Sequence, residues 1–333
     1  MFSRFVMVAA WCAWIAAACG CAHRASSPAA GATGVALVET NDVVRVLLDG
    51  KLFTEYHFRA VSRPFLYPLL NADGEHMTRR WPQEDASGEE HDHPHHHSFW
   101  YSHGDVNGAD LWSEVEKAGR TVHQSIVRKE SGRDLGVLAT RNEWRAKDGT
   151  LLGHDERTYR FHRPRGAERV IDFEVTIHAS AGEITLGDTK EGTFAIRVAE
   201  SMRVKLPGNK PGPGHLVNAQ GLLDGAVWGK RSEWADYSGP VNGKVSGIAI
   251  LDAPTNPRHP TWWHARDYGL FAANPFGIHD FEKKEKGAGD MKIPAGGSVA
   301  FRYRVILHPG DAKAADVAGH FARYTREMGA RTK

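Results

Sequence analysis

Cysteine is scarce in this sequence and confined to one end of it. The three cysteines among the 333 residues are Cys12, Cys19 and Cys21. The rest of the chain therefore cannot form an internal disulfide, whatever its redox compartment. A chain of this length buries enough surface to fold without one. We expect a hydrophobic core alone to stabilise it.

The sequence also lacks a surplus of one charge and, beyond residue 22, any long apolar run. Its 42 Lys and Arg residues nearly balance its 40 Asp and Glu residues. No basic block with interleaved aromatics occurs, so we expect no nucleic-acid partner. No later segment approaches the roughly 20 apolar residues of a membrane-spanning helix. Glycine (35) and tryptophan (10) are plentiful, which suits a turn-rich β protein.

The first residues have the features of an export signal. Met1–Arg4 carries one positive charge, Phe5–Ala18 is apolar, and small residues follow as far as Cys21. This order is typical of a secretory signal peptide. A cysteine directly after Gly20 resembles a lipobox, so we predict a lipoprotein signal peptide over residues 1–20 and lipidation of Cys21, with Cys19, which follows three alanines, as the weaker candidate. An ordinary signal peptide or an uncleaved anchor is the alternative.

A lipidated Cys21 would place the protein at the bacterial cell envelope, on the periplasmic face or at the outer membrane. The membrane contact would be through the lipid anchor only. Residues 21–33 are rich in Ser, Ala, Gly and Pro and predict a flexible tether. Residues 34–330 would then form a single β-sandwich domain, because all-β domains can be this long.

Strand patterns dominate that domain. Phe173–Ile177 alternates apolar and polar residues, as a strand with one wet face does. Only Ala312–Glu327 has the pattern of a helix, and Lys205–Lys244, rich in Gly and Pro, predicts long loops. The fold class is therefore all-β, a sandwich with one C-terminal helix. Strands are expected at Val35–Glu39, Val43–Leu48, Leu52–Phe58, Val122–Val127, Val137–Trp144, Thr158–His162, Val170–His178, Thr193–Val198, Gly247–Leu251, Tyr268–Ala272 and Val299–Leu307.

Histidine is concentrated in one window, His91–Asp105, which holds six of the 19 histidines. Imidazole is a common metal ligand and titrates near neutral pH. We predict a functional pocket here, with His96 and His103 as acid/base groups. One variant places a divalent metal on His93, His95 and His96; no other cofactor is expected. The alternative without a function is a hydrogen-bonded polar loop with solvated histidines.

Further clusters mix charged, amide and aromatic groups. Lys190 and Glu191 are adjacent before a strand, and Glu191 is the predicted catalytic carboxylate. Aromatic planes beside polar groups suit a sugar, whose C–H face stacks while its hydroxyls form hydrogen bonds. The alternatives are an exposed ion pair and tryptophans that pack on the core. The predicted substrate-binding residues are Arg79, Trp100, Asn107, Lys190, Arg197, Trp234, Tyr237, Asn256, Trp263, His264, Arg266 and Asn274.

Four of these segments carry a family resemblance that extends from about Val35 to Glu327. The sequence resembles the family labelled "methane oxygenase PmoA-like" in Asp92–His96, His103–Gly108, Lys190–Gly192 and Pro260–Gly269. That label implies a metal-dependent oxygenase. A fainter likeness links Ile293–Val305 to the closing strand of galactose-mutarotase-like supersandwiches. It implies a β-supersandwich that handles sugars with a histidine and a carboxylate.

Three functions stay open at this point. In the first, the exported lipoprotein is a carbohydrate-active isomerase, lyase or hydrolase. An imidazole of His96 or His103 and the carboxylate of Glu191 then exchange protons with a sugar or an oxidised glycoside. In the second, the protein captures a glycan at the cell surface without catalysis. The third is the metal-dependent oxygenase that the family label suggests.

The lipid anchor gives the first test. Cys21→Ser should prevent acylation and release the protein into the soluble exported fraction, because no other segment is expected to hold it on a membrane. Carbonate extraction of membranes, followed by immunoblotting, measures this. A Cys21→Ser protein that stays with the membrane would refute the lipoprotein prediction, and Cys12→Ser is the matched control.

Overall fold

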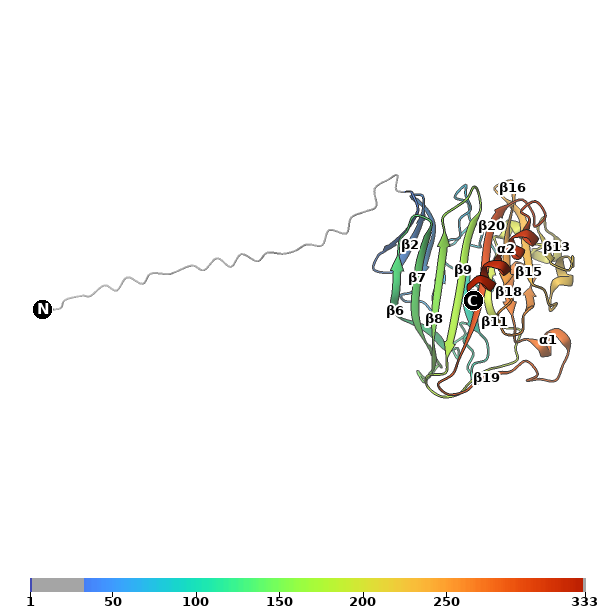
Figure 1. The fold of residues 1–333 in the computed structure, drawn as a ribbon. Coiled ribbons are helices and arrows are strands. Elements are labelled where there is room, and N and C mark those ends of the chain that lie inside the picture. Colours follow the sequence, from blue (N-terminus) through green and yellow to red (C-terminus); the bar gives the residue numbers. More distant parts are fainter. Residues whose placement is uncertain (2–32, 332–333) are drawn as a thin grey trace.

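The computed structural model describes Met1 and residues 33–331 (Figure 1). The predicted signal peptide beyond Met1, the tether up to residue 32 and the lipidated Cys21 therefore lie outside the described residues. Within 33–331, no helix is both long and apolar enough to cross a membrane.

Two antiparallel eight-stranded sheets make up the fold. The first sheet has the order β1-β2-β3-β4-β5-β11-β18-β17, and its strands are Val35–Glu39, Val43–Leu48, Lys51–His57, Phe65–Leu66, Phe99–His103, Gly192–Arg197, Leu270–Asn274 and Trp262–Ala265. The second has the order β14-β15-β16-β20-β9-β8-β7-β6, with His215–Asn218, Trp234–Val241, Lys244–Asp252, Ser298–Pro309, Arg169–His178, Leu151–His162, Leu135–Arg145 and Arg120–Glu130.

Aromatic rings join the two sheets into a sandwich. The side chains of β9 alternate, so that Phe173 is buried between the sheets while Glu174 is half-buried on the other face. The ring centroid of Phe173 lies 5.5 Å from Phe99 and 5.2 Å from Phe194, both on the first sheet. Phe194 in turn stacks on Tyr303 of β20 at 4.8 Å. The alternation predicted for the strands is thus the feature that builds the core.

The C-terminal helix α2, Val317–Arg331, covers the outer face of the second sheet. Val317, Tyr324 and Met328 pack there against Leu251 and Ile306. The prediction of an all-β sandwich closed by one C-terminal helix is confirmed, with a later helix start than expected. The short elements are β10 (Ile184–Leu186), β19 (Met291–Ile293), β12 (Lys205–Leu206), β13 (Lys210–Pro211), α1 (Ile278–Glu282) and the 3₁₀ turns η1 (Glu200–Met202), η2 (Pro207–Asn209) and η3 (Asp224–Val227).

The prediction of long loops over Lys205–Lys244 is wrong. This segment contains β14 and β15, which pair with each other, and β15 also pairs with β16 along its whole length. Ser238, Gly239 and Pro240 are poor strand formers, so the local sequence does not predict β15. Pairing with β16 stabilises this strand.

Candidate functional site

The outer face of the first sheet has a shallow floor across its last four strands, β5, β11, β18 and β17. The register aligns Trp100 of β5, Ala195 of β11, Ala272 of β18 and His264 of β17 in one row across four strands. Their neighbours along each strand point into the core, so this row faces outward. The two alanines in the middle of the row leave an open space, with Trp100 on one side and His264 on the other.

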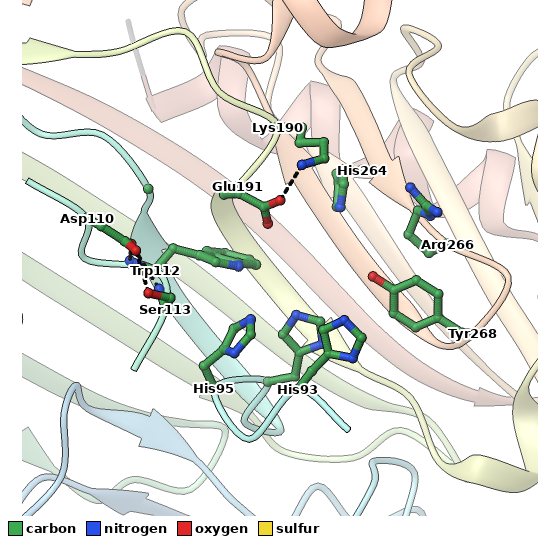
Figure 2. Close-up of a pocket in the computed structure, with 12 residues that line it drawn as sticks. His93, His95, Asp110, Trp112, Ser113, Lys190, Glu191, His264, Arg266 and Tyr268 are labelled. Carbon is green, nitrogen blue, oxygen red and sulfur yellow. Dashed lines mark hydrogen bonds and ion pairs between the residues drawn. The ribbon is translucent and has the colours of Figure 1, made fainter. Parts of the chain in front are cut away.

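A cavity of about 470 Å³ lies over this floor (Figure 2). Four loops and strand β17 enclose it, and it is open to solvent. The residues that line it are His93, His95, His96, Gly104, Asp110, Trp112, Ser113, Lys190, Glu191, His264, Arg266 and Tyr268.

A buried charge network fixes the histidine loop over the sheet. Arg79 donates to the Asp92 carboxylate and to the backbone oxygens of Asp92 and His93, the latter two at 3.0 and 3.1 Å. Arg197 of β11 donates to the same Asp92 carboxylate at 3.1 Å. Burial raises the pKa of Asp92, but His93, Arg197 and Arg79 together lower it well below its usual value. Asp92 is therefore an anion at neutral pH, and we call Asp92, Arg79 and Arg197 the Asp92 network.

The Asp92 network also sets the chemistry of His96. Arg197 Nη1 lies 3.2 Å from His96 Nδ1. A guanidinium can only donate, so Nδ1 accepts and the ring hydrogen is on Nε2. Burial and the Arg197 charge lower the pKa of His96 well below its usual value. His96 is a neutral hydrogen-bond donor at neutral pH.

Two more imidazoles of the cavity are neutral for the same reasons. Burial, with the charge of Arg63, lowers the pKa of His95 to about 4. Burial, with the charges of Arg266 and Lys190, lowers the pKa of His264 to about 3. The indole Nε1 of Trp228 donates to His264 Nδ1 at 3.4 Å, which leaves the hydrogen of His264 on Nε2.

Glu191 is the carboxylate at the centre of the cavity. Figure 2 shows its side chain projecting inward between Trp112 and His264, with Lys190 Nζ 2.6 Å from its Oε1. Both side chains are 38% exposed, so they reach solvent and a ligand alike. Asn274 Nδ2 donates to the carbonyls of Thr189 and Lys190, each at 2.9 Å, and so holds the turn that presents the pair.

Aromatic rings form two walls of the cavity. Trp112 is buried at the floor, with its ring 6.0 Å from that of His96. Tyr268 stacks on His93 at 5.2 Å, and the guanidinium of Arg266 lies 5.5 Å from its ring. Burial raises the pKa of Tyr268, so its phenol is neutral. Both aromatic side chains belong to the cavity lining.

The structure brings together many of the residues expected from the sequence. His93, His95, His96, Lys190, Glu191, His264 and Arg266 all line the cavity. Four others support it from behind: Arg79 and Arg197 through the Asp92 network, Trp100 under His96 with rings 5.5 Å apart, and Asn274 at the Glu191 turn.

Six other expected residues lie elsewhere. His103 points inward from β5, where Nε2 lies 2.9 Å from Gly187 O; burial lowers its pKa to about 4. Trp263 has the opposite orientation to His264 and is fully buried. The predicted roles of His103 and Trp263 at the cavity are therefore corrected, and four further residues lie away from it as well. Trp234 lies half-buried near α2, and the Tyr237 hydroxyl donates to the backbone oxygens of Arg266 and Asp267. Asn256 donates to the Asp252 carboxylate and the Arg302 backbone oxygen. Asn107 is exposed and forms hydrogen bonds with the backbone of Glu183 and Thr185.

Five residues of the cavity lining were missed: Gly104, Asp110, Trp112, Ser113 and Tyr268. Tyr268 lies in Pro260–Gly269, one of the segments that carry the family resemblance, so its place in the cavity could have been predicted from that segment. The carboxylate of Asp110 accepts the N–H groups of Trp112 and Ser113, which orders their loop. This loop has no motif that predicts its position, because it is placed by contacts across the sheet.

The metal variant for His93, His95 and His96 does not fit the geometry. Nε2 of His96 carries a hydrogen because Arg197 occupies Nδ1. Arg197 is buried and paired with Asp92, so its guanidinium stays in place and would repel a cation. In the part of the chain that the structure describes, one other group of His and Glu residues has the spacing of a metal site.

Comparison with known sequences identifies the family but no activity. Residues 43–322 match a family described as "Family of unknown function (DUF6807)". The chain belongs to this family. No curated protein sequence matches it. Because the matched description names no oxygenase, the PmoA-like resemblance stays a prediction.

Three solved structures are similar at very low identity. A galactose mutarotase related enzyme from Lactobacillus acidophilus is 10% identical, with 82% of this chain and 97% of that chain covered and a TM-score of 0.30. A GalM/aldose epimerase homologue from C. elegans is 9% identical, with 84% and 99% covered and a TM-score of 0.29. A 4-alpha-glucanotransferase from Thermococcus litoralis is 9% identical, with 82% and only 37% covered and a TM-score of 0.24. The function is argued below from this chain's own residues.

Substitution of Trp263 separates a core role from a ligand role. Trp263→Ala should lower the free energy of unfolding by about 3–5 kcal/mol, because it leaves a cavity in the sandwich. Urea denaturation measures this, and Trp234→Ala, a half-buried tryptophan, is the control with a smaller cost. An unchanged unfolding midpoint with weakened ligand binding would restore Trp263 to the binding site.

Proposed function

We propose that the protein is a cell-envelope lipoprotein that binds a sugar or an oxidised glycoside and acts on it by proton transfer to Glu191. The observation that supports this most is the cavity itself. The Glu191 carboxylate faces neutral imidazoles and two cations, Lys190 and Arg266, beside the rings of Trp112 and Tyr268. The other carboxylate of the lining, Asp110, accepts hydrogen bonds from its own loop.

The donors of the cavity outnumber its free acceptors. His96 and His264 each carry the hydrogen on Nε2, and Lys190 and Arg266 are donors only. Such a site favours a ligand rich in oxygen atoms, including the carbonyl or carboxylate oxygen of an oxidised sugar. The C–H face of the sugar would pack on Trp112 or Tyr268.

The roles of the residues follow from their protonation states. Imidazoles with pKa values of about 3 and 4 are almost never charged at neutral pH, so His264 and His95 would hold oxygens by hydrogen bonds. Glu191 is then the group that accepts a proton from the ligand. Lys190, 2.6 Å away, would stabilise negative charge that develops on the neighbouring oxygen. His103 is removed from the proton-transfer role proposed from the sequence.

Glu191→Gln tests catalysis directly. This substitution keeps the shape but removes the base, so turnover should fall by about 10²–10⁴-fold with little change in ligand affinity. Free sugars, glycosides and their keto forms are screened by NMR and mass spectrometry, with binding measured in parallel. Glu183→Gln, at an exposed carboxylate, is the control. If the wild type binds glycans but forms no product, the enzyme proposal is wrong and the protein is a surface glycan-binding protein.

The pH profile gives an independent test. Since the pKa values of His95 and His264 are lowered to about 4 and 3, neither should titrate between pH 5.5 and 8. Ligand affinity should therefore show no step from either ring across that range, because both keep the same charge state. Isothermal titration calorimetry across pH measures this. An inflection near pH 6.5 that disappears in His264→Gln would contradict the proposed neutral donors.

A further inference from the structure

A second cluster of ligating side chains lies on the outer face of the other sheet. His154 and Glu156 are two residues apart on β8, so both point the same way. His178 at the end of β9 is the direct cross-strand partner of His154. One nitrogen or oxygen of each residue lies within 4.8 Å of those of the other two. β8 and β9 lie side by side in Figure 1.

We propose that His154, Glu156 and His178 bind a divalent transition-metal ion of the zinc class. Two imidazoles and one carboxylate form a common zinc ligand set, with a fourth position open to water or a ligand. Zinc ligands about 2.0–2.1 Å from the ion are about 3.3 Å apart at tetrahedral angles. The atoms here lie within 4.8 Å of one another, so they need to approach by up to about 1.5 Å, which rotation of the exposed Glu156 side chain and ring movements can supply.

The surroundings of the two rings support an ion more than simple stacking. The imidazoles lie parallel, 4.6 Å apart at 12°. Ser180 Oγ lies 2.8 Å from His154 Nδ1 and can orient this ring with Nε2 outward, as outer partners of metal-binding histidines do. Nε2 of His178 is shielded from solvent and has no hydrogen-bond partner. Such an orphaned ring nitrogen is costly without a partner, and an ion would supply one.

One cation competes for the site. Arg141 of β7, which is exposed, places Nη2 3.1 Å from His154 Nε2. Its side chain must move away when an ion binds, so the guanidinium and the metal exclude each other. This predicts that loss of Arg141 strengthens metal binding, whereas a purely structural histidine pair would gain nothing.

Zinc binding to the purified protein tests the site without any enzymatic assay. Titration with ZnCl2 in a calorimeter, and the visible absorption of the Co²⁺ form, should show one equivalent that the double variant His154→Gln/His178→Gln lacks. Ser180→Ala should weaken that equivalent about 10–100-fold, and Arg141→Ala should tighten it. His95→Gln should leave it unchanged, which separates it from any ion in the cavity.

Circular dichroism of the metal-free variants checks that each one folds. Zinc should raise the unfolding temperature of the wild type but not that of the double variant. Zinc binding that persists in the double variant, or that is unaltered by both Ser180→Ala and Arg141→Ala, would overturn the proposal. Neither result bears on Glu191, so the two proposals can fail separately.

Discussion

The ion pairing of Asp92 with two buried guanidiniums is the interaction on which the site depends. Arg79 is 1% exposed and Arg197 is fully buried, so neither has water to solvate its charge. Burial of such charges is expensive unless they are paired and hydrogen-bonded. Asp92 and the backbone oxygens of the histidine loop provide those partners, and Glu200 lies 3.8 Å from Arg197. The loop therefore cannot leave the sheet without exposing unpaired charge.

The same positive charge determines what the nearby histidines can do. Two guanidiniums share one close carboxylate in the Asp92 network, so an imidazolium beside them would be repelled as well as desolvated. His96 is therefore neutral, and its Nδ1 accepts a hydrogen bond from Arg197. Glu191 stands on the opposite side of the alanine floor, next to Lys190. His96 and Glu191 thus both line the cavity, and Lys190 lies beside the carboxylate, so a ligand there can contact donors and the proton acceptor together.

The sequence predicts much of the fold because alternation is a local property. The strand that carries Phe173 and the helix that packs on the second sheet were both visible in the residue pattern. Which residues face the cavity depends on register, which is not local. His103 and Trp263 have the right chemistry but point inward, and Trp112 reaches the cavity through a loop with no motif. The approach of His178 to His154 likewise depends on the pairing of β8 with β9.

The protonation state of His96 tests the central claim most directly. Nitrogen-15 NMR of histidine-labelled protein, with His96→Gln to assign the signals, reports charge and tautomer at each ring. The Asp92 network predicts a neutral ring with its hydrogen on Nε2 throughout pH 5.5–8, and a change in that signal in Arg197→Lys. A charged ring at pH 7, or a hydrogen on Nδ1, would contradict the account.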